Sequence, residues 1–223
     1  MKLANKKLLI FDLDGTLINS ALDLALAVNY MLETLERATF SEDIIHGWVG
    51  NGALTLVKRA LSGCRTVDEN LDEAYVEKAL KNFLDYYAKN LCNATVPYPH
   101  VIGTLRTLKE KYTLAIITNK PFAFVSPILK GLEMGGLFEL ILGGDSLKEK
   151  KPHPMPLLHV CEHLSISVEA SVMVGDSKND ILAANACGMD SVGVTYGYNY
   201  GEDIGVHKPS LIIDNFKDLL EYL

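Results

Sequence analysis

The chain has 223 residues, of which 48% are hydrophobic, and carries a formal net charge of −7 at pH 7. This length and apolar content are enough for a substantial core, so they exclude a mainly disordered chain. The acidic balance also argues against broad binding to nucleic acids or anionic membranes, because both require a basic face. A small-molecule partner is the better prediction.

The first predicted strand is the apolar run Leu8–Phe11, which ends directly at Asp12 and Asp14. Carboxylates this close together raise each other's pKa, so a cation or a chemical role is expected to compensate for their repulsion. Gly15 permits a tight turn that leads away from the strand.

After this turn, only helical patterns are recognised up to about residue 96. Ser20 and Asp23 resemble a capping box that opens the first of these helices. Apolar residues at helical spacing then form two stripes. The stripes consist of Leu24, Val28, Met31, Leu32 and Leu35, and of Val76, Leu80, Phe83, Leu84, Tyr87 and Leu91.

Pro97 and Pro99 mark the return from these helices to the sheet. We therefore predict a core made of residues 1–15 and 97–223, with an all-helical cap, residues 16–96, inserted after the first strand. An insertion at the carboxyl end of a strand lies over the crevice where open α/β sheets bind ligands.

Short apolar runs recur in the rest of the chain and alternate with segments of helical spacing. The runs are Tyr112–Thr118, Leu140–Leu142, Ser171–Val174 and Ser191–Val194, with a further candidate at Leu211–Ile213. Strands that are apolar on both faces and alternate with helices indicate a parallel sheet covered on both sides. The pattern predicts an α/β fold with a doubly wound parallel sheet.

Polar residues follow several of these strands. They are Asp12 and Asp14, then Thr118, Asn119 and Lys120, then Lys151, and finally Asp176, Ser177 and Asp180. Each group has an ordinary structural interpretation by itself, such as a turn, a helix cap or a solvated loop. Ser177 with Asp180, for example, is also a plausible capping box. A parallel sheet would gather all of them at one edge, and this combination favours an active site.

These residue types suit phosphoryl transfer. Asp12 can attack phosphorus and form an aspartyl phosphate. Asp12 and Asp176, with a backbone carbonyl near Asp14, offer the hard oxygen ligands that Mg²⁺ prefers. Lys151 and the Thr118 hydroxyl would then stabilise the phosphoryl charge. Asp14, if shielded from the metal, can protonate the leaving alcohol and accept a proton from the attacking water.

The motifs "DLDGT", "TN" after a strand, "KKP" and "GDSxxD", in this order, resemble those of the haloacid dehalogenase superfamily. The resemblance covers essentially the whole chain and implies an aspartate-based phosphotransferase on a Rossmann-like sheet with a helical cap and Mg²⁺ as cofactor. The pattern of a nucleophilic Asp followed by a second Asp two residues later resembles the phosphatase and phosphomutase branch of the superfamily. The implied roles are Asp12 as nucleophile, Asp14 as acid and base, Thr118 and Lys151 as phosphate ligands, Asp176 as metal ligand, and Asp180 as support for the metal or Lys151.

Longer segments resemble bacterial phosphoglycolate phosphatases. They are "GWVGNGA" at 47–53, "TNKP" at 118–121, "KKPHPMPLL" at 150–158 and "VGVTYGYNYGE" at 192–202. This resemblance implies a small phosphorylated acid as substrate, and 2-phosphoglycolate is the leading candidate. One departure is Asn19, where many relatives carry Asp.

Substrate contacts beyond the phosphate are predicted from charge and from backbone pattern. Gly50-Asn51-Gly52 forms a potential anion nest, so Asn51 is a candidate substrate contact. A substrate carboxylate needs a second cation, for which Lys120 is favoured because it adjoins Thr118. Lys58 and Arg59 are weaker candidates, since a solvated helix face explains both.

Three alternatives stay open from the sequence. A phosphomutase or a sugar-phosphate phosphatase of the same superfamily would share the motifs. A phospho-receiver domain also gathers acidic residues, a Thr and a Lys on a doubly wound sheet, but its acceptor lies on a later strand and it lacks the helical insertion.

The four cysteines form no CxxC pair, which predicts free thiols in a reducing compartment. No apolar run approaches the length of a membrane span, and the amino terminus leads into a strand rather than a signal-peptide core. We therefore expect a cytoplasmic monomer or homodimer.

Overall fold

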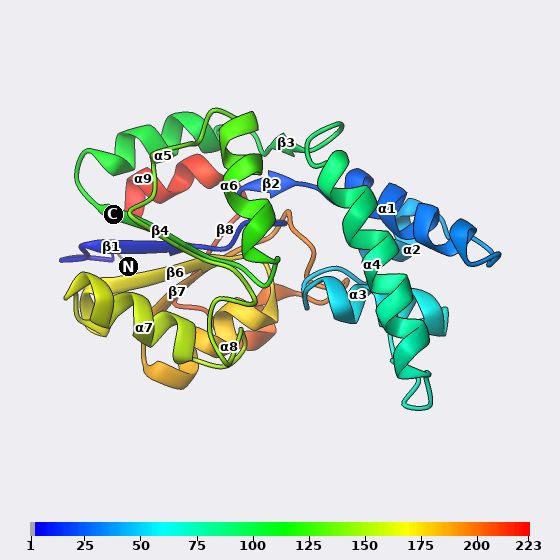
Figure 1. The fold of residues 1–223 in the computed structure, drawn as a ribbon. Helices are drawn as coiled ribbons and strands as arrows, with labels where there is room; N and C mark the ends of the chain where they lie inside the picture. Colours follow the sequence, from blue (N-terminus) through cyan, green and yellow to red (C-terminus); the bar gives the residue numbers. More distant parts are fainter. Residues whose placement is uncertain (1–2) are drawn as a thin grey trace.

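A computed structural model describes residues 3–223 and contains one large parallel sheet (Figure 1). Its six strands lie in the order β5-β4-β1-β6-β7-β8, and every neighbouring pair is parallel. The strands are β1 Leu8–Phe11, β4 Thr113–Ile117, β5 Leu140–Leu142, β6 Ser171–Gly175, β7 Asp190–Val194 and β8 Leu211–Ile213. The doubly wound α/β prediction is confirmed, and each predicted run forms a strand, β8 included.

Helices cover both faces of this sheet. In Figure 1, α5, α6 and α9 lie above it, and α7 and α8 lie below. Their bounds are α5 Val101–Lys109, α6 Phe122–Gly131, α7 Met155–Leu164, α8 Lys178–Cys187 and α9 Leu219–Tyr222. Three short 3-10 helices cover Val168–Ala170, Ile204–His207 and Phe216–Asp218.

The central strand β1 shows why the sheet is buried on both sides. Leu9 and Phe11 belong to the hydrophobic cluster that includes α5 and α6, whereas Leu8 and Ile10 belong to the cluster that includes α7 and α8. Successive side chains of a strand point to opposite faces, so both faces of β1 must be apolar. All four of its residues are fully buried.

Helices α1 Ala21–Thr34, α2 Glu42–His46, α3 Ala53–Ser62 and α4 Glu73–Lys89 form a second body, on the right of Figure 1. Their buried side chains make a hydrophobic cluster of their own, to which the core contributes Tyr198. On this ground we propose residues 16–96 as the cap unit. A separate core allows such a unit to move relative to the sheet without loss of its own packing.

The segment between β1 and α5 is not exclusively helical. The two-residue strands β2 Ile18–Asn19 and β3 Val96–Pro97 pair antiparallel, and so tie together the chain that leaves for the cap and the chain that returns. The prediction of helical patterns alone missed this pair, because two residues are too few to establish an alternation.

The predicted capping box at the start of α1 is wrong, although Ser20 does precede the helix. The Ser20 hydroxyl instead donates to Asp14 Oδ1 at 2.5 Å. The buried Asp23 carboxylate accepts hydrogen bonds from the backbone N–H groups of Ala94 and Thr95 and from the Thr95 hydroxyl. Asp23 therefore stabilises the returning chain and does not cap its own helix.

All four cysteines are free, as predicted. Within residues 3–223, the structure has no helix with the length and apolarity needed to span a bilayer.

Candidate active site

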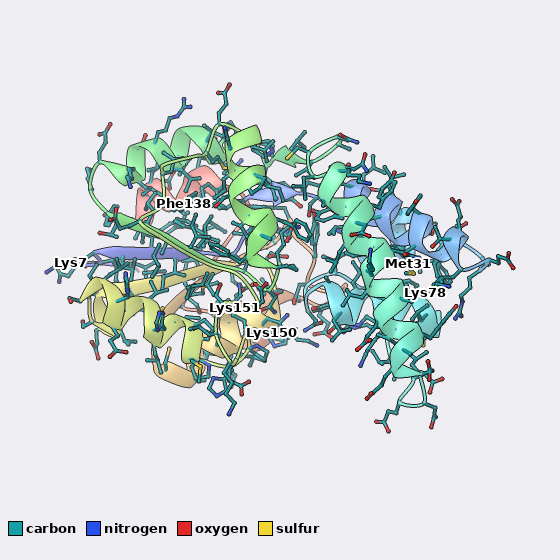
Figure 2. The ribbon with its side chains drawn as sticks, viewed as in Figure 1. Lys7, Met31, Lys78, Phe138, Lys150 and Lys151 are labelled. Carbon is teal, nitrogen blue, oxygen red and sulfur yellow. The ribbon has the colours of Figure 1, made fainter. Side chains whose placement is uncertain are left out.

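Most of the predicted site residues line one pocket between the sheet and the cap; Asp176 and Asn51 do not line it. Lys151 lies near the end of the sheet that faces the cap helices, whereas Lys7, at the start of β1, lies at the far end (Figure 2). The lining residues from the core are Asp12, Asp14, Thr118, Asn119, Lys120, Pro121, Phe124, Lys151, Ser177, Asn179 and Asp180. Those from the cap are Leu24, Val49, Gly50, Gly52, Ala53, Leu56, Phe83 and Tyr87.

Three carboxylates gather where Asp12 and Asp180 line this pocket. Asp12, Asp176 and Asp180 are buried, and one oxygen from each lies within 4.8 Å of the others. Burial, with added repulsion from Asp180 and Asp14, raises the pKa of Asp12 to about 7 even though Lys151 opposes the shift. Burial and the neighbouring Asp12 and Asp180 likewise raise the pKa of Asp176 well above its ordinary range.

Lys151 is the cation of this cluster. Its Nζ lies 2.9 Å from Asp12 Oδ1 and 2.6 Å from Asp180 Oδ1, and it donates to the Ile117 carbonyl at 2.5 Å. Burial by itself would lower the pKa of Lys151, but Asp12 and Asp180 raise it, so the side chain stays charged. A fixed buried cation beside the candidate nucleophile suits the stabilisation of a phosphoryl group.

Asp180 is held by hydrogen bonds through both of its carboxylate oxygens. Its Oδ2 accepts hydrogen bonds from the Ser177 backbone N–H at 3.0 Å and from the Ser177 hydroxyl at 2.9 Å, and its Oδ1 meets Lys151. The predicted capping box at the start of α8 is confirmed. The same carboxylate therefore starts the helix and orients Lys151.

Asp176 is held from two sides. Its Oδ1 accepts from the Thr16 hydroxyl at 2.8 Å, and its Oδ2 accepts from the Tyr198 backbone N–H at 2.6 Å. A Cβ at Gly15, whose φ is +91°, would collide with the Asp176 carboxylate. Gly15 thus serves two needs, the left-handed turn after Asp14 and the close approach of Asp176.

The acidic cluster fits a hard divalent cation. Its donors are carboxylate oxygens, and burial together with mutual repulsion raises the pKa values of Asp12 and Asp176, a cost that a bound cation would relieve. Asp12 and Asp176, with Asp180 beside them, are the residues that would hold it. We propose Mg²⁺ as this cation.

Metal binding gives a testable dependence of stability on pH. Because Asp12 binds a proton more tightly when folded, its contribution to the unfolding free energy of the metal-free protein falls as pH rises from about 4 through about 7. We therefore expect Mg²⁺ to raise the melting temperature little at about pH 5 and strongly at about pH 8.

The difference between scans with Mg²⁺ and with a chelator isolates this contribution from the other carboxylates. Asp176→Asn should reduce the gain at the higher pH. An equal gain at every pH, or none, would show that the acidic cluster is not the metal site.

Asp14 lies in a different environment from Asp12, although only Leu13 separates them. It is not part of the acidic cluster, and its carboxylate meets Lys120 Nζ at 2.9 and 3.0 Å and the Ser20 hydroxyl. Burial would lower the pKa of Lys120, but Asp14 and Tyr87 raise it above its ordinary value. The two carboxylates are therefore fit for different roles. The predicted contribution to metal binding of a backbone carbonyl near Asp14 stays a prediction.

Thr118 and Asn119 follow β4 at the pocket edge. The Thr118 hydroxyl accepts from the Lys120 backbone N–H at 3.2 Å. Asn119 Nδ2 donates to the Lys151 carbonyl at 3.0 Å and to the Gly50 carbonyl at 3.1 Å. Asn119 thus connects the lysine loop with the cap.

The loop Gly50–Gly52 is bound to the core in this structure. The Gly50 carbonyl also accepts from Asn179 Nδ2, and the Asn51 carbonyl accepts from Lys150 Nζ at 2.7 Å. The Asn51 side chain accepts from the Tyr200 hydroxyl at 2.7 Å. Gly50 and Gly52 line the pocket, but Asn51 is not among the lining residues. Its predicted substrate contact stays a prediction.

The two weaker cation candidates do not reach the pocket. Lys58 and Arg59 are absent from its lining, and Arg59 Nη1 donates to the Trp48 carbonyl within the cap at 2.6 Å. Lys120 does line it. Sequence reasoning did not single out Asn179 or Tyr200 as contacts of the cap, since neither has a charge or spacing that marks such a role.

Comparison with known proteins places this geometry in a family. Residues 9–194 match the family described as haloacid dehalogenase-like hydrolase. The chain belongs to this family. The predicted resemblance to the haloacid dehalogenase superfamily is confirmed, and the match covers the strands that carry Asp12, Thr118 and Asp176.

Individual relatives align with this chain over nearly its full length. A phosphoglycolate phosphatase of Colwellia psychrerythraea is 55% identical over 99% of this chain and 98% of its own. One of Psychrobacter arcticus is 49% identical over 98% and 96%. The crystal structure of a predicted phosphoglycolate phosphatase from Haemophilus somnus has 43% identity, a TM-score of 0.92 and 98% coverage of both chains. The predicted resemblance to bacterial phosphoglycolate phosphatases is confirmed.

Proposed function

We propose that this hydrolase is a Mg²⁺-dependent phosphatase that converts 2-phosphoglycolate to glycolate and phosphate through an aspartyl phosphate on Asp12. The observation that carries the proposal is that the neighbouring carboxylates of Asp12 and Asp14 have different contacts. Asp12 faces Lys151 and the acidic cluster, whereas Asp14 faces Lys120 and Ser20. The names of the relatives at 49–55% identity support the substrate.

In the first step, an Asp12 carboxylate oxygen forms a bond to phosphorus, and the bond from phosphorus to the glycolate oxygen breaks. Asp14 donates a proton to that leaving oxygen. In the second step, water attacks phosphorus, Asp14 takes a proton from the water, and the bond to Asp12 breaks. Bound Mg²⁺ would neutralise phosphoryl charge, together with Lys151 and the Thr118 hydroxyl.

The pocket also offers a place for the second charge of the substrate. Lys120 is buried, charged and lines the pocket on the side of Asp14. We propose that Lys120 receives the substrate carboxylate.

We also propose that the protein is cytoplasmic, because its four cysteines are free.

A phosphate-release screen with Mg²⁺ tests this function. We expect the kcat/KM for 2-phosphoglycolate to exceed that for hexose phosphates by at least about 100-fold, because a hexose phosphate has no carboxylate for Lys120 and would bury hydroxyl groups against apolar cap residues. A phosphomutase would retain the phosphoryl group and return it to the sugar. Failure to release phosphate from 2-phosphoglycolate would refute the proposal.

A further inference from the structure

Tyr87 of the cap helix α4 has a fixed position in the wall of the pocket. Its side chain is 1% exposed. Its ring stacks on Phe83 with a centroid distance of 5.8 Å, and meets Phe124 edge-on at 5.3 Å. Phe124 belongs to α6 of the core, so the ring is held from both the cap and the core.

The hydroxyl of this tyrosine forms no hydrogen bond of normal geometry within the described protein, and its charged neighbour Lys120 is itself paired with Asp14. Among residues 3–223, Tyr87 Oη is buried and has no hydrogen-bond partner. Buried polar atoms are nearly always hydrogen-bonded, because leaving one unpaired is costly. The packing of the ring is explained by the cap core, but the hydroxyl is not.

The positive charge beside Tyr87 comes from Lys120, which also pairs with Asp14. Lys120 Nζ lies 4.8 Å from the centre of its ring, and this ammonium carries its charge to high pH. Burial raises the pKa of Tyr87 to about 12, so its hydroxyl stays protonated at neutral pH and can donate. A phenol O–H beside an ammonium offers two donors of the kind that a carboxylate accepts.

The other cap residues at the pocket are mostly apolar. Leu24, Val49, Leu56 and Phe83 line it and provide no hydrogen-bonding side chain. A polyhydroxylated sugar would bury its hydroxyl groups against them without partners, which is unfavourable. Within residues 3–223, four side chains have an unpaired buried atom, and of these only Tyr87 comes from the cap.

We propose that Tyr87 is a specificity-determining residue whose hydroxyl donates a hydrogen bond to the carboxylate of the substrate, next to Lys120. The proposal rests on the proposed function, since it assumes a small phosphorylated acid in this pocket. The phosphoryl group would lie at Asp12 and Lys151, and the carboxylate would connect Lys120 of the core with Tyr87 of the cap. Recognition of the carboxylate is thereby coupled to the position of the cap.

The test uses Tyr87→Phe, which keeps the ring and removes only the unpaired hydroxyl. Two substrates are compared with Mg²⁺, 2-phosphoglycolate and ethyl phosphate, which has a similar size but no carboxylate. We expect kcat/KM for 2-phosphoglycolate to fall by about 10- to 100-fold, mainly through KM, because a hydrogen bond to a charged group is lost. The kcat/KM for ethyl phosphate should stay within about 2-fold.

Tyr86→Phe is the matched control, because Tyr86 neighbours Tyr87 on α4, stacks on Tyr30 and does not line the pocket. It should leave both substrates unchanged. An equal loss for both substrates in Tyr87→Phe would indicate a structural role, and no loss for either would show that the hydroxyl is unused. Both results would overturn the inference. A wild-type protein without preference for 2-phosphoglycolate over ethyl phosphate would instead overturn the proposed function.

Discussion

Asp12→Asn lowers kcat on 2-phosphoglycolate by about 10⁴-fold or more, because the amide cannot attack phosphorus and no other carboxylate takes its place. Asp176 and Asp180 are close by, but both are held by hydrogen bonds from Thr16, Tyr198 and Ser177. Steady-state phosphate release measures the effect.

The same substitution should not unfold the protein. Burial and repulsion raise the pKa of Asp12 to about 7, so its charge is unfavourable in the folded state above that pH. We therefore expect Asp12→Asn to melt at the same or a higher temperature than the wild type in chelator at about pH 8. Asp85→Asn, on the exposed surface of α4, is the control and should keep full activity. Activity above a tenth of wild type in Asp12→Asn would exclude Asp12 as nucleophile.

Lys151→Met has the second large effect, since it removes the cation from a buried acidic cluster. Lys151 Nζ contacts both Asp12 and Asp180, and its side chain is 1% exposed. Removing one partner of a buried ion pair leaves an uncompensated charge and costs about 3 kcal/mol or more of stability. We also expect kcat to fall by about 10²- to 10³-fold, because the phosphoryl charge loses a fixed partner.

Urea unfolding with Mg²⁺ and with chelator measures the stability part. The loss should be smaller with Mg²⁺, since the metal supplies positive charge to the same carboxylates. Lys148→Met is the matched control, because Lys148 is exposed and outside the pocket. Wild-type stability of Lys151→Met in chelator would contradict the role of Lys151 as the cation of this cluster.

The sequence predicts the framework of the site well because the relevant signals are local. Leu8–Phe11 is apolar on both faces and stops at Asp12, so both its burial and its end follow from the residues themselves. Thr118, Lys151 and Asp176 could be placed together because parallel strands end at one edge of a sheet. The Ser177–Asp180 capping box also lies within one turn of one helix.

The predictions that failed, or could not be made, depend on distant partners. The Ser20–Asp23 pattern is identical in form to a capping box, but Asp23 binds a backbone segment 71 and 72 residues away. The β2–β3 pair joins two strands of two residues each, which carry no periodicity.

Tyr87 illustrates a further limit of sequence patterns. Its place in an apolar helical stripe correctly predicts burial, and it does belong to the cap core. No pattern states that its hydroxyl lacks a partner, since this depends on Phe124 and Lys120 of the core as well as on α4.

The central claim is that Asp12 becomes phosphorylated during turnover, and rapid acid quench with 2-phosphoglycolate and Mg²⁺ tests it most directly. Peptide mass spectrometry of the quenched protein should find one added phosphoryl group on the peptide that contains Asp12, and none in Asp12→Asn. Continued phosphate release with no phosphorylated peptide, or with the group on another residue, would contradict the account.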